Sequence, residues 1–374
     1  MTIRVKTLNF VCKGLLFLWK TCIPGIYKTK REAFDMSRFA KCTLVVSAVF
    51  CLFFSQATSQ NNYGTEDELK KKAAELFEEE EFIQAYPLYS QLLALYNKDG
   101  NYNYRFGVCM LYSVAEKEKA IQYLEIASKY PDAEPEVWFF LGKAFHVNYR
   151  FNEAITAYNK YKLVSTPKKV VKYQVDRQIE MCNNGKKLLK NLTDLEVLDK
   201  KELAKGDFFR SYDLNDFNAK LIVMPDEFKT DFDKKRKKEN FIMYSEQGKE
   251  EIYFASYGKD GKAGKDIYVK RKLPNGEYGK AVALGYPVNT EFDEDFPFLH
   301  PNGKILYFCS KGHNSMGGYD VFKSERNDAT GTWSKPVNMD FAINTPDDDF
   351  MFVSDADDKI GYFASTRESS GDMV

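Results

Sequence analysis

The chain has 374 residues, of which 44% are hydrophobic and 29% are charged, so it is long enough for two folded domains of ordinary composition. Its 54 basic and 54 acidic residues balance, and a general electrostatic attraction to nucleic acid or to anionic lipid is therefore not indicated. Beyond residue 60 the only cysteines are Cys109, Cys182 and Cys309, widely separated and without the CxxC spacing of zinc sites. This excludes a disulfide framework, and we expect three small buried residues.

The amino terminus has the order of residues found in an export signal. Arg38 and Lys41 precede the apolar run Cys42–Phe54, whose 13 residues are fewer than the roughly 20 that cross a bilayer. Small residues suited to cleavage follow at Ser55–Ser59. We therefore predict a signal peptide over residues 36–59 and export from the cytoplasm.

Two features of this region leave alternatives open. Met36 is a second plausible start, so residues 1–35 are either an over-extended translation start or a basic region that precedes the signal. Acylation of Cys51 would make the protein a lipoprotein, but the bulky Phe50 stands where a small residue is expected. The sequence favours cleavage without lipidation.

Residues 65–191 carry helical spacing. Thr65 and Glu68 have the spacing of a capping box, and apolar residues then recur at three- and four-residue intervals. Ala85, Ala120 and Ala154 lie 35 and 34 residues apart, and each is followed four residues later by Tyr89, Leu124 or Tyr158. We predict three helix pairs, and a final helix that begins at Thr166-Pro167 and runs to about Asn191 to cover the open end.

The third copy carries the fullest pattern. It places small residues where two helices would cross closely and large ones in the groove between them, at Trp138, Leu141, Gly142, Phe145, Ala154, Tyr158 and Pro167. These residues resemble the tetratricopeptide repeat family. The resemblance implies an α-solenoid over residues 60–191, with a concave groove that binds extended peptides or partner helices. Tyr104, Arg105 and Asn148 are the predicted partner-binding residues of that groove. Ordinary helix surface is the alternative for each of them, and a structural spacer is the alternative for the array.

Residues 195–374 follow a second repeat. The segments Tyr253–Ser256, Tyr307–Ser310 and Tyr362–Ser365 are spaced by 54 and 55 residues and lie in alternating, strand-like runs. At the same period Tyr278 matches Trp333, Val282 matches Val337, Asn289-Thr290 matches Asn344-Thr345, and Phe296 matches Phe350. Pro301-Asn302-Gly303 predicts a tight turn between two of the strands. Four short antiparallel strands per unit is the arrangement of a propeller blade.

The repeat resembles the WD40-like PD40 repeats of TolB-type propellers. The residues that carry this resemblance are Asn289-Thr290, Asp295-Phe296, His300-Pro301-Asn302-Gly303, Leu306-Tyr307-Phe308 and Gly318–Phe322. Lys259–Lys262 and the charged insert Asp226–Glu239 depart from it. The resemblance implies an incomplete antiparallel β-propeller, because closed propellers need four to eight blades. We expect the sequence to be a truncated piece of a longer protein, or its open edge to be covered by a partner.

The combination of the two repeats is similar to Gram-negative envelope proteins that an OmpA-like domain usually completes. The chain contains no OmpA-like segment, so peptidoglycan is expected as a partner only if such a domain follows in the full gene. The resemblance implies an α + β protein of separate domains in the periplasm, associated with the outer membrane. Its expected partners are envelope proteins or extended peptides, with only indirect membrane association and no nucleic acid.

Catalytic patterns are missing from the sequence. The three histidines, His146, His300 and His313, are scattered, and no GxSxG, HExxH, P-loop or GxGxxG pattern occurs. The acidic runs Asp293–Asp295 and Asp347–Asp349 stand at equivalent repeat positions, which favours turn capping over a catalytic pair that is needed only once. Asp355–Asp358 lacks the glycine and the final glutamate of a calcium loop.

We therefore predict no catalytic residues, no metal and no cofactor. The predicted function is that of an exported, non-catalytic scaffold for protein interactions in the cell envelope, serving outer-membrane, secretion or gliding machinery. The alternatives are a propeller-based enzyme and a sensor for a small ligand or ion, both of which would need a polar cluster that the sequence does not reveal.

Overall fold

The structure is a computed structural model that describes residues 3–5 and 65–371, except for residues 115, 191–194, 205–208, 210–211, 213, 237–239, 247–248, 260 and 262–263. The chain divides into two compact units, residues 11–75 and residues 1–10 with 76–374. The predicted signal peptide at residues 36–59, Cys51 and the final strand at Asp372 lie outside the described residues. In the described ranges no helix is both long and apolar enough to span a membrane.

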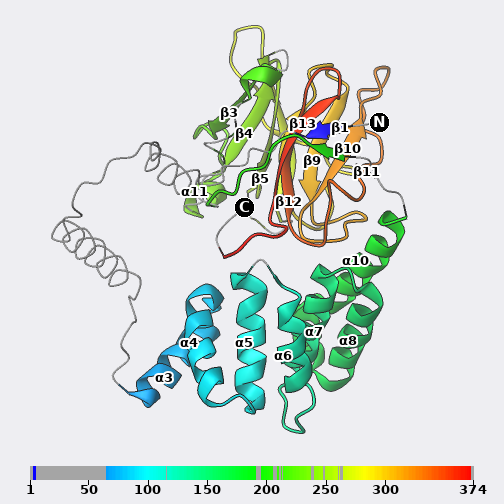
Figure 1. The fold of residues 1–374 in the computed structure, drawn as a ribbon. Coiled ribbons are helices and arrows are strands. Elements are labelled where there is room, and N and C mark those ends of the chain that lie inside the picture. Colours follow the sequence, from blue (N-terminus) through cyan, green and yellow to red (C-terminus); the bar gives the residue numbers. More distant parts are fainter. Residues whose placement is uncertain are drawn as a thin grey trace, which may run out of the picture. The chain divides into compact units, whose positions relative to one another are not determined.

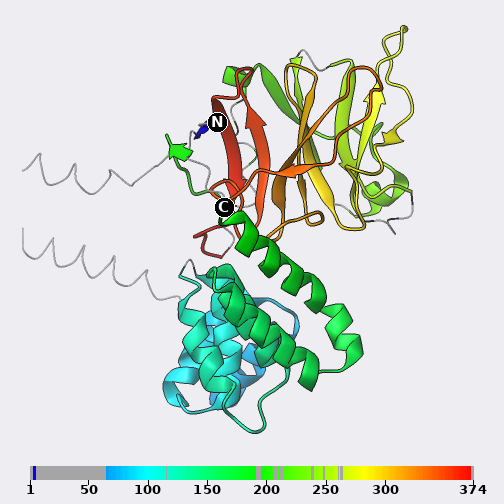
Figure 2. The same ribbon diagram turned by 90° about the vertical axis from the view of Figure 1, so that its right-hand side faces the viewer.

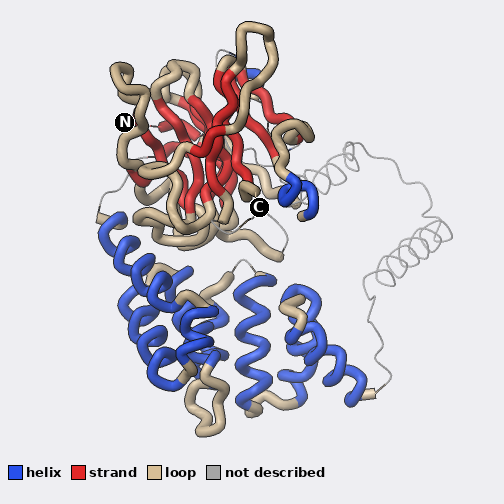
Figure 3. The backbone as a smooth tube through the Cα atoms, turned by 180° about the vertical axis from the view of Figure 1, so that it is seen from behind, coloured by secondary structure: helices blue, strands red, loops and turns tan. Residues whose placement is uncertain are grey.

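Apart from β1 (Ile3–Val5) and short helical turns at Asn215–Phe217 and Asp231–Lys235, helices and strands occupy separate parts of the chain, as predicted (Figure 1 and Figure 3). Residues 66–188 form helices, of which those from residue 82 onward pack on their neighbours in chain order, and strands follow from residue 195. The helices are α3 (Glu66–Glu78), α4 (Phe82–Leu95), α5 (Gly100–Ser113), α6 (Lys119–Ala127), α7 (Glu136–Val147), α8 (Phe151–Val164), α9 (Pro167–Lys172) and α10 (Val175–Leu188). The division into a helical part and an antiparallel strand part is thus confirmed.

Close crossings hold the helical pairs together. A Cβ atom added at Gly142 of α7 would lie 2.6 Å from the Tyr158 ring of α8, and one at Gly107 of α5 would lie 2.8 Å from Leu124 of α6. Tyr158 and Leu124 are fully buried. The same small-against-large contact therefore recurs in two successive pairs, because only glycine lets the backbone approach this closely.

The end of the helical part differs from the prediction. Thr166 caps α9 through the Lys169 amide, and Pro167 occupies the first turn, as expected. The single final helix reaching Asn191 is wrong, however, because Gln174 takes a left-handed conformation (φ 47°) that separates α9 from α10. Trp138 is also only half-buried, with the Lys160 ammonium 5.8 Å from its ring centroid.

Among the described residues the strands belong to four short sheets. Figure 2 shows the strand part from a second direction. Three of them are antiparallel throughout. They are formed by β3 (Ala219–Val223) with β4 (Phe241–Ser245), by β5 (Glu251–Ser256), β6 (Asp266–Arg271) and β7 (Val282–Ala283), and by β8 (Glu294–Leu299), β9 (Ile305–Ser310), β10 (Asp320–Glu325) and β11 (Val337–Asn338). In the fourth, β12 (Asp349–Ser354) pairs antiparallel with β13 (Ile360–Ser365), and β1 (Ile3–Val5) pairs in parallel with β13 and β2 (Leu195–Val197).

The strand register bears out most of the predicted repeat. The three Tyr-Phe segments fall on β5, β9 and β13, and Tyr278 and Trp333 form equivalent isolated bridges to the ends of β6 and β10. The predicted turn is also present, with Gly303 at φ +70° between β8 and β9. The strands β5, β6 and β7 of one unit therefore have the same order and antiparallel pairing as β9, β10 and β11 of the next.

The alignment of the acidic runs is wrong by one residue. Glu294 pairs with Ser310 as Asp349 pairs with Ser365, so Phe296 corresponds to Met351 and not to Phe350. Phe296 and Met351 both have positive φ angles, 50° and 55°, inside the register shift of β8 and β12. The shift is a β-bulge, which the spacing of aromatic residues alone does not reveal.

Candidate functional site

Each strand unit contains the same buried group of a threonine, a carboxylate and a serine. The serine hydroxyls of Ser256, Ser310 and Ser365 donate to Asp233, Glu294 and Asp349 at 2.6, 2.6 and 2.5 Å. A threonine hydroxyl reaches the same carboxylate at 2.8, 2.7 and 2.8 Å, from Thr230, Thr290 and Thr345 in turn. Each of the three carboxylates therefore has a structural role as a hydrogen-bond acceptor inside its unit, which is what the recurrence of the acidic runs predicts.

The charged insert keeps this group intact in the first unit. Asp233 is carried by a short helix, α11 (Asp231–Lys235), and not by a strand. Thr230 caps that helix in a full capping box with Asp233, so one carboxylate both ends the helix and binds Ser256. The insert thus changes the local structure but preserves the contact.

In two of the units an asparagine joins the unit to the strand before it. Asn289 accepts from the Ile267 amide at 3.0 Å and donates to its carbonyl at 3.1 Å. Asn344 does the same at Val321, at 2.7 and 2.9 Å. Since the threonine that follows each asparagine binds the next unit's carboxylate, the Asn-Thr pair bonds to both sides of a junction between units.

Burial changes the acidity of two carboxyl groups in the strand part, Glu294 of these groups and Asp320 of β10. Burial raises the pKa of Glu294 to about 7 against the opposing effect of its hydroxyl and amide donors. Burial also raises the pKa of Asp320 to about 8. The Asp320 carboxylate accepts hydrogen bonds from the Met316 amide and the Asn338 side chain. Both groups therefore titrate far above their ordinary range.

Arg177 of α10 connects the helical part to the loop Lys311–Gly318 of the strand part. Its buried guanidinium donates to the carbonyl oxygens of Lys311, Gly312 and His313 at 2.7, 2.9 and 3.2 Å, and to the Ser315 hydroxyl at 2.7 Å. Asn184, two turns along α10, donates to the Ser315 carbonyl at 3.2 Å. One helix therefore satisfies four of the loop's carbonyl groups, those of Lys311, Gly312, His313 and Ser315.

The three histidines are each bound to a backbone carbonyl. His146 of α7 donates from Nε2 to Met316 at 2.8 Å, and burial lowers its pKa to about 4. Nε2 of His300 contacts the Asp355 carbonyl at 2.8 Å, while Nδ1 accepts from the Asn302 amide. Nε2 of His313 lies 2.9 Å from the Val288 carbonyl, and burial lowers its pKa. The three rings thus serve packing and loop conformation.

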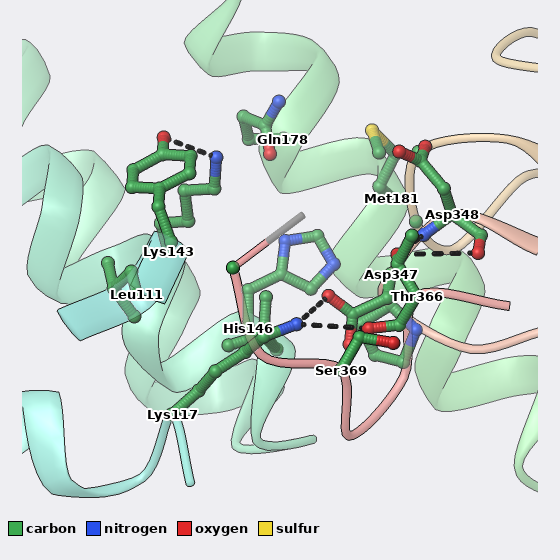
Figure 4. A pocket seen from close by; sticks show the side chains of 16 residues that line it. Leu111, Lys117, Lys143, His146, Gln178, Met181, Asp347, Asp348, Thr366 and Ser369 are labelled. Atoms are coloured by element: carbon green, nitrogen blue, oxygen red, sulfur yellow. Dashed lines mark hydrogen bonds and ion pairs between the residues drawn. The ribbon is translucent and has the colours of Figure 1, made fainter. Parts of the chain in front are cut away.

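A pocket of about 350 Å³ lies beside this junction (Figure 4). Its helical wall comes from α5, α7 and α10, and its other wall from three loops of the strand part. The lining residues are Leu111, Tyr112, Lys117, Lys143, His146, Val147, Gln178, Met181, Gly317, Gly318, Pro346, Asp347, Asp348, Thr366, Ser369 and Gly371.

Charged groups of both signs face the pocket. Lys117 bridges to Asp347 at 2.5 Å, whereas the ammonium of Lys143 donates to the Tyr112 hydroxyl at 2.8 Å (Figure 4). Burial would lower the pKa of Lys143, but the Tyr112 hydroxyl and the Asp347 and Asp348 carboxylates raise it overall. The pocket can therefore receive a polar group of a partner at its lysine side while remaining close to neutral in total charge.

The predicted partner-binding residues do not gather at the pocket. Tyr104 is buried against Phe77 and Phe140, so its predicted place on an exposed groove is wrong. Arg105 is held by the Tyr89 hydroxyl at 2.9 Å and lies over the Phe77 ring, and Asn148 caps the end of α7 through the Ala144 carbonyl. Aromatic packing between successive helices accounts for the burial of Tyr104.

Other predicted features take structural roles. Asp355 accepts from the amides of Lys359 and Ile360, and Asp358 accepts from Ser354 and Tyr307, as in a tight turn. In the part of the chain that the structure describes, no cluster of histidine, cysteine and acidic residues could hold a metal. The three described cysteines, at positions 109, 182 and 309, are free and buried, as expected.

The sequence did not single out Arg177, Lys117 or Lys143, because each is one polar residue on an otherwise ordinary helix. Gly317-Gly318 was a signal for the close approach of two loops of the strand part, because a Cβ at either glycine would clash with the loop Thr345–Asp348. Compared with known protein families, with curated proteins and with solved structures, the chain matches none of them. The function is therefore inferred from the contacts of its own residues.

Proposed function

We propose that the protein is an exported, non-catalytic scaffold that holds partner proteins in the envelope of a Gram-negative cell. The observation that carries the proposal is the junction itself. A helical array and a set of repeated strand units are tied together by Arg177, and a pocket remains open between them. A scaffold needs this combination of a rigid connection and an accessible recess, because a partner then meets surfaces of fixed relative position.

The helical part supports the proposal through its repeated crossings. Gly142 against Tyr158 and Gly107 against Leu124 are the contacts that a tetratricopeptide array would make, and we propose that residues 60–191 form such an array. In such an array the inner helices line a concave face, here α5 and α7, which also supply Tyr112 and Lys143 to the pocket. An extended segment of a partner could enter there.

The strand part supports the proposal through its repeated carboxylates. We propose that the four-stranded sheet β8–β11 and its neighbours are blades of a PD40-type propeller, joined by their Asn-Thr pairs. In the units described, the buried acids and the three histidines are bound to hydroxyls, amides and carbonyls of the protein itself. Groups committed to the fold in this way are poorly placed to carry out acid–base chemistry.

The interaction can be tested by photo-crosslinking from the pocket. A photoreactive amino acid at Gln178 or Ser369, one from each wall, should capture a discrete envelope protein in cells. The same amino acid at the exposed Lys187 of α10, away from the pocket lining, is the matched control. Equal or absent products at the three positions would contradict the proposal.

Export can be tested separately by mass spectrometry of the protein recovered from a cell fraction. We expect a periplasmic or outer-membrane-associated chain whose first residue follows Ala57 or Ser59. A cytoplasmic protein that retains residues 36–59 would show that the localisation is wrong without affecting the crosslinking result.

A further inference from the structure

The two ends of the helical array carry opposite charges. Residues 76–97, which finish α3 and form α4, contain four glutamates and no lysine or arginine. Residues 154–175, which form most of α8 and all of α9, contain five lysines and no acidic residue. The whole chain is neutral, so this is a segregation of charge and not an excess of one sign.

The acidic end, defined as Glu78–Glu81, lies in the exposed turn between α3 and α4. Glu78 is 3.6 Å from the Arg105 guanidinium, and Glu81 accepts from the Gln84 side chain. Glu79 and Glu80 project from the same exposed turn, where Glu80 has a positive φ of 61°. Ile83, 39% exposed, adds an apolar side chain next to these carboxylates.

The basic end, defined as Lys160–Lys172, lies at the other end of the row of helices, where Figure 1 labels α8. Lys162 and Lys169 form ion pairs with Asp176 and Glu136 at 2.5 and 2.6 Å. Lys168 and Lys172 are exposed on α9.

Apolar side chains accompany the lysines of the basic end. Leu163 and Val171 are 82% and 75% exposed. Each stands two positions from a tyrosine, Tyr161 or Tyr173, that packs on Phe139, so both point away from the helical core. Leu163 and Val171 therefore offer apolar area, beside the lysine charges, that a docked partner would remove from water.

We propose that the basic end of one chain docks on the acidic end of a second copy, giving head-to-tail self-association. The complementary charges are both present on this chain, both are exposed, and they stand at opposite ends of the array. A contact between two different surfaces of identical chains continues from copy to copy until a ring closes or a filament forms. The lysine and glutamate side chains steer the encounter, and Ile83, Leu163 and Val171 lose their exposure to water in the contact.

The test is sedimentation velocity of the full chain over a range of concentrations and salt. We expect concentration-dependent association at low salt that is lost at about 1 M salt, where charges are screened beyond about 3 Å. Reversing the acidic end (Glu79→Lys with Glu80→Lys) or the basic end (Lys168→Glu with Lys172→Glu) should each weaken association at least about tenfold.

Two further samples make the result decisive. An equimolar mixture of the two reversed variants, or one chain carrying both reversals, should associate again, because opposite charges then face each other once more. The pair Lys187→Glu with Lys190→Glu changes the charge equally at the end of α10 and just after it, outside the basic end, and should leave association unchanged. Helical circular dichroism should be the same in all variants.

A monomer at every concentration would overturn the proposal, and so would association that neither reversal weakens or that the mixture does not restore. A basic end that recognises some other acidic partner would give the first of these results. Neither outcome depends on the crosslinking experiment at the pocket, so the two proposals can fail independently.

Discussion

The helical and strand parts of this protein repeat by different physical means. The helical pairs are joined by shape, with a glycine on one helix admitting a large side chain from the next, as at Gly142 and Tyr158. The strand units are joined by buried polar groups, as at Thr290, Glu294 and Ser310. Apolar contacts tolerate some rearrangement, whereas a buried polar group that loses its partner is left unsatisfied. The two parts should therefore respond differently to similar substitutions.

The largest effect is expected in the helical part. Tyr158→Ala removes a fully buried ring from the α7–α8 crossing and should lower the free energy of unfolding by about 3–5 kcal/mol. Denaturant unfolding followed by far-ultraviolet circular dichroism measures it. Tyr286→Ala, at a position 87% exposed, should change stability by no more than about 0.5 kcal/mol. Similar losses from both substitutions would contradict the shape-based account.

The junction between the parts should come next. Arg177→Met keeps a long side chain but leaves three carbonyl groups of the loop Lys311–Gly318 without their donor, at an expected loss of about 3 kcal/mol. Unfolding should then separate into two transitions, one for each part, in differential scanning calorimetry. Arg150→Met, at an arginine paired only with nearby Glu153 and the Phe145 ring, should retain the wild-type profile. A single unaltered transition in both variants would show that Arg177 does not couple the parts.

The strand part should also lose stability as the pH rises. Because the pKa of Glu294 is raised from 4.5 to about 7, the folded state binds this proton more tightly than the unfolded state. The resulting stability is fully present below about pH 4.5 and is lost as pH rises through about 7.

Glu294→Gln should remove this contribution and make the loss of stability between about pH 5 and pH 7 shallower, by up to about 1.4 kcal/mol per pH unit. Denaturant unfolding at several pH values measures it. Asp320, with a pKa of about 8, leaves a residual slope, and His146, with its lowered pKa, contributes an opposite slope in both proteins. Identical pH profiles would mean that Glu294 is ionised throughout.

The smallest losses of stability are expected when the three serines are replaced by alanine. The three losses should be equal if the units are equivalent. Ser256→Ala, Ser310→Ala and Ser365→Ala each remove one donor to a buried carboxylate and should each cost about 1 kcal/mol. Ser334→Ala, outside these groups, serves as the comparison. If only one of the three losses is measurable, the units are similar in sequence but not in energetics.

Several features could be predicted from the sequence because each depends on the type of a single residue at one position. The caps at Thr65 and Thr166, the glycine of the Pro301–Gly303 turn and the small residue at Gly142 follow from local rules of backbone geometry. The Asn-Thr pairs were recognised as a repeat, although their bonds to both neighbouring units were not foreseen.

The remainder depends on contacts between residues far apart in the chain. Tyr104 is buried because Phe77 and Phe140 close over it, and neither its own type nor its spacing reveals this. Arg177 and the loop Lys311–Gly318 are more than 130 residues apart in the chain. The β-bulges at Phe296 and Met351 shift the pairing of β8 with β9 and of β12 with β13, and the spacing of the repeated residues does not reveal them. Local patterns thus predicted the elements, but not the junction or the pocket.

The Asn-Thr pairs have a consequence for how such a chain could change its length. Asn289 binds the preceding strand β6, and Thr290 binds the carboxylate of Glu294 in the following unit. Every added unit would therefore contain all the residues of one connection between units. Gene duplication that copies a whole period would insert a unit already able to fasten itself on both sides. A deletion with its breakpoint between the two residues would instead leave one strand and one acid without their fastening, so natural variants are expected to differ by entire periods.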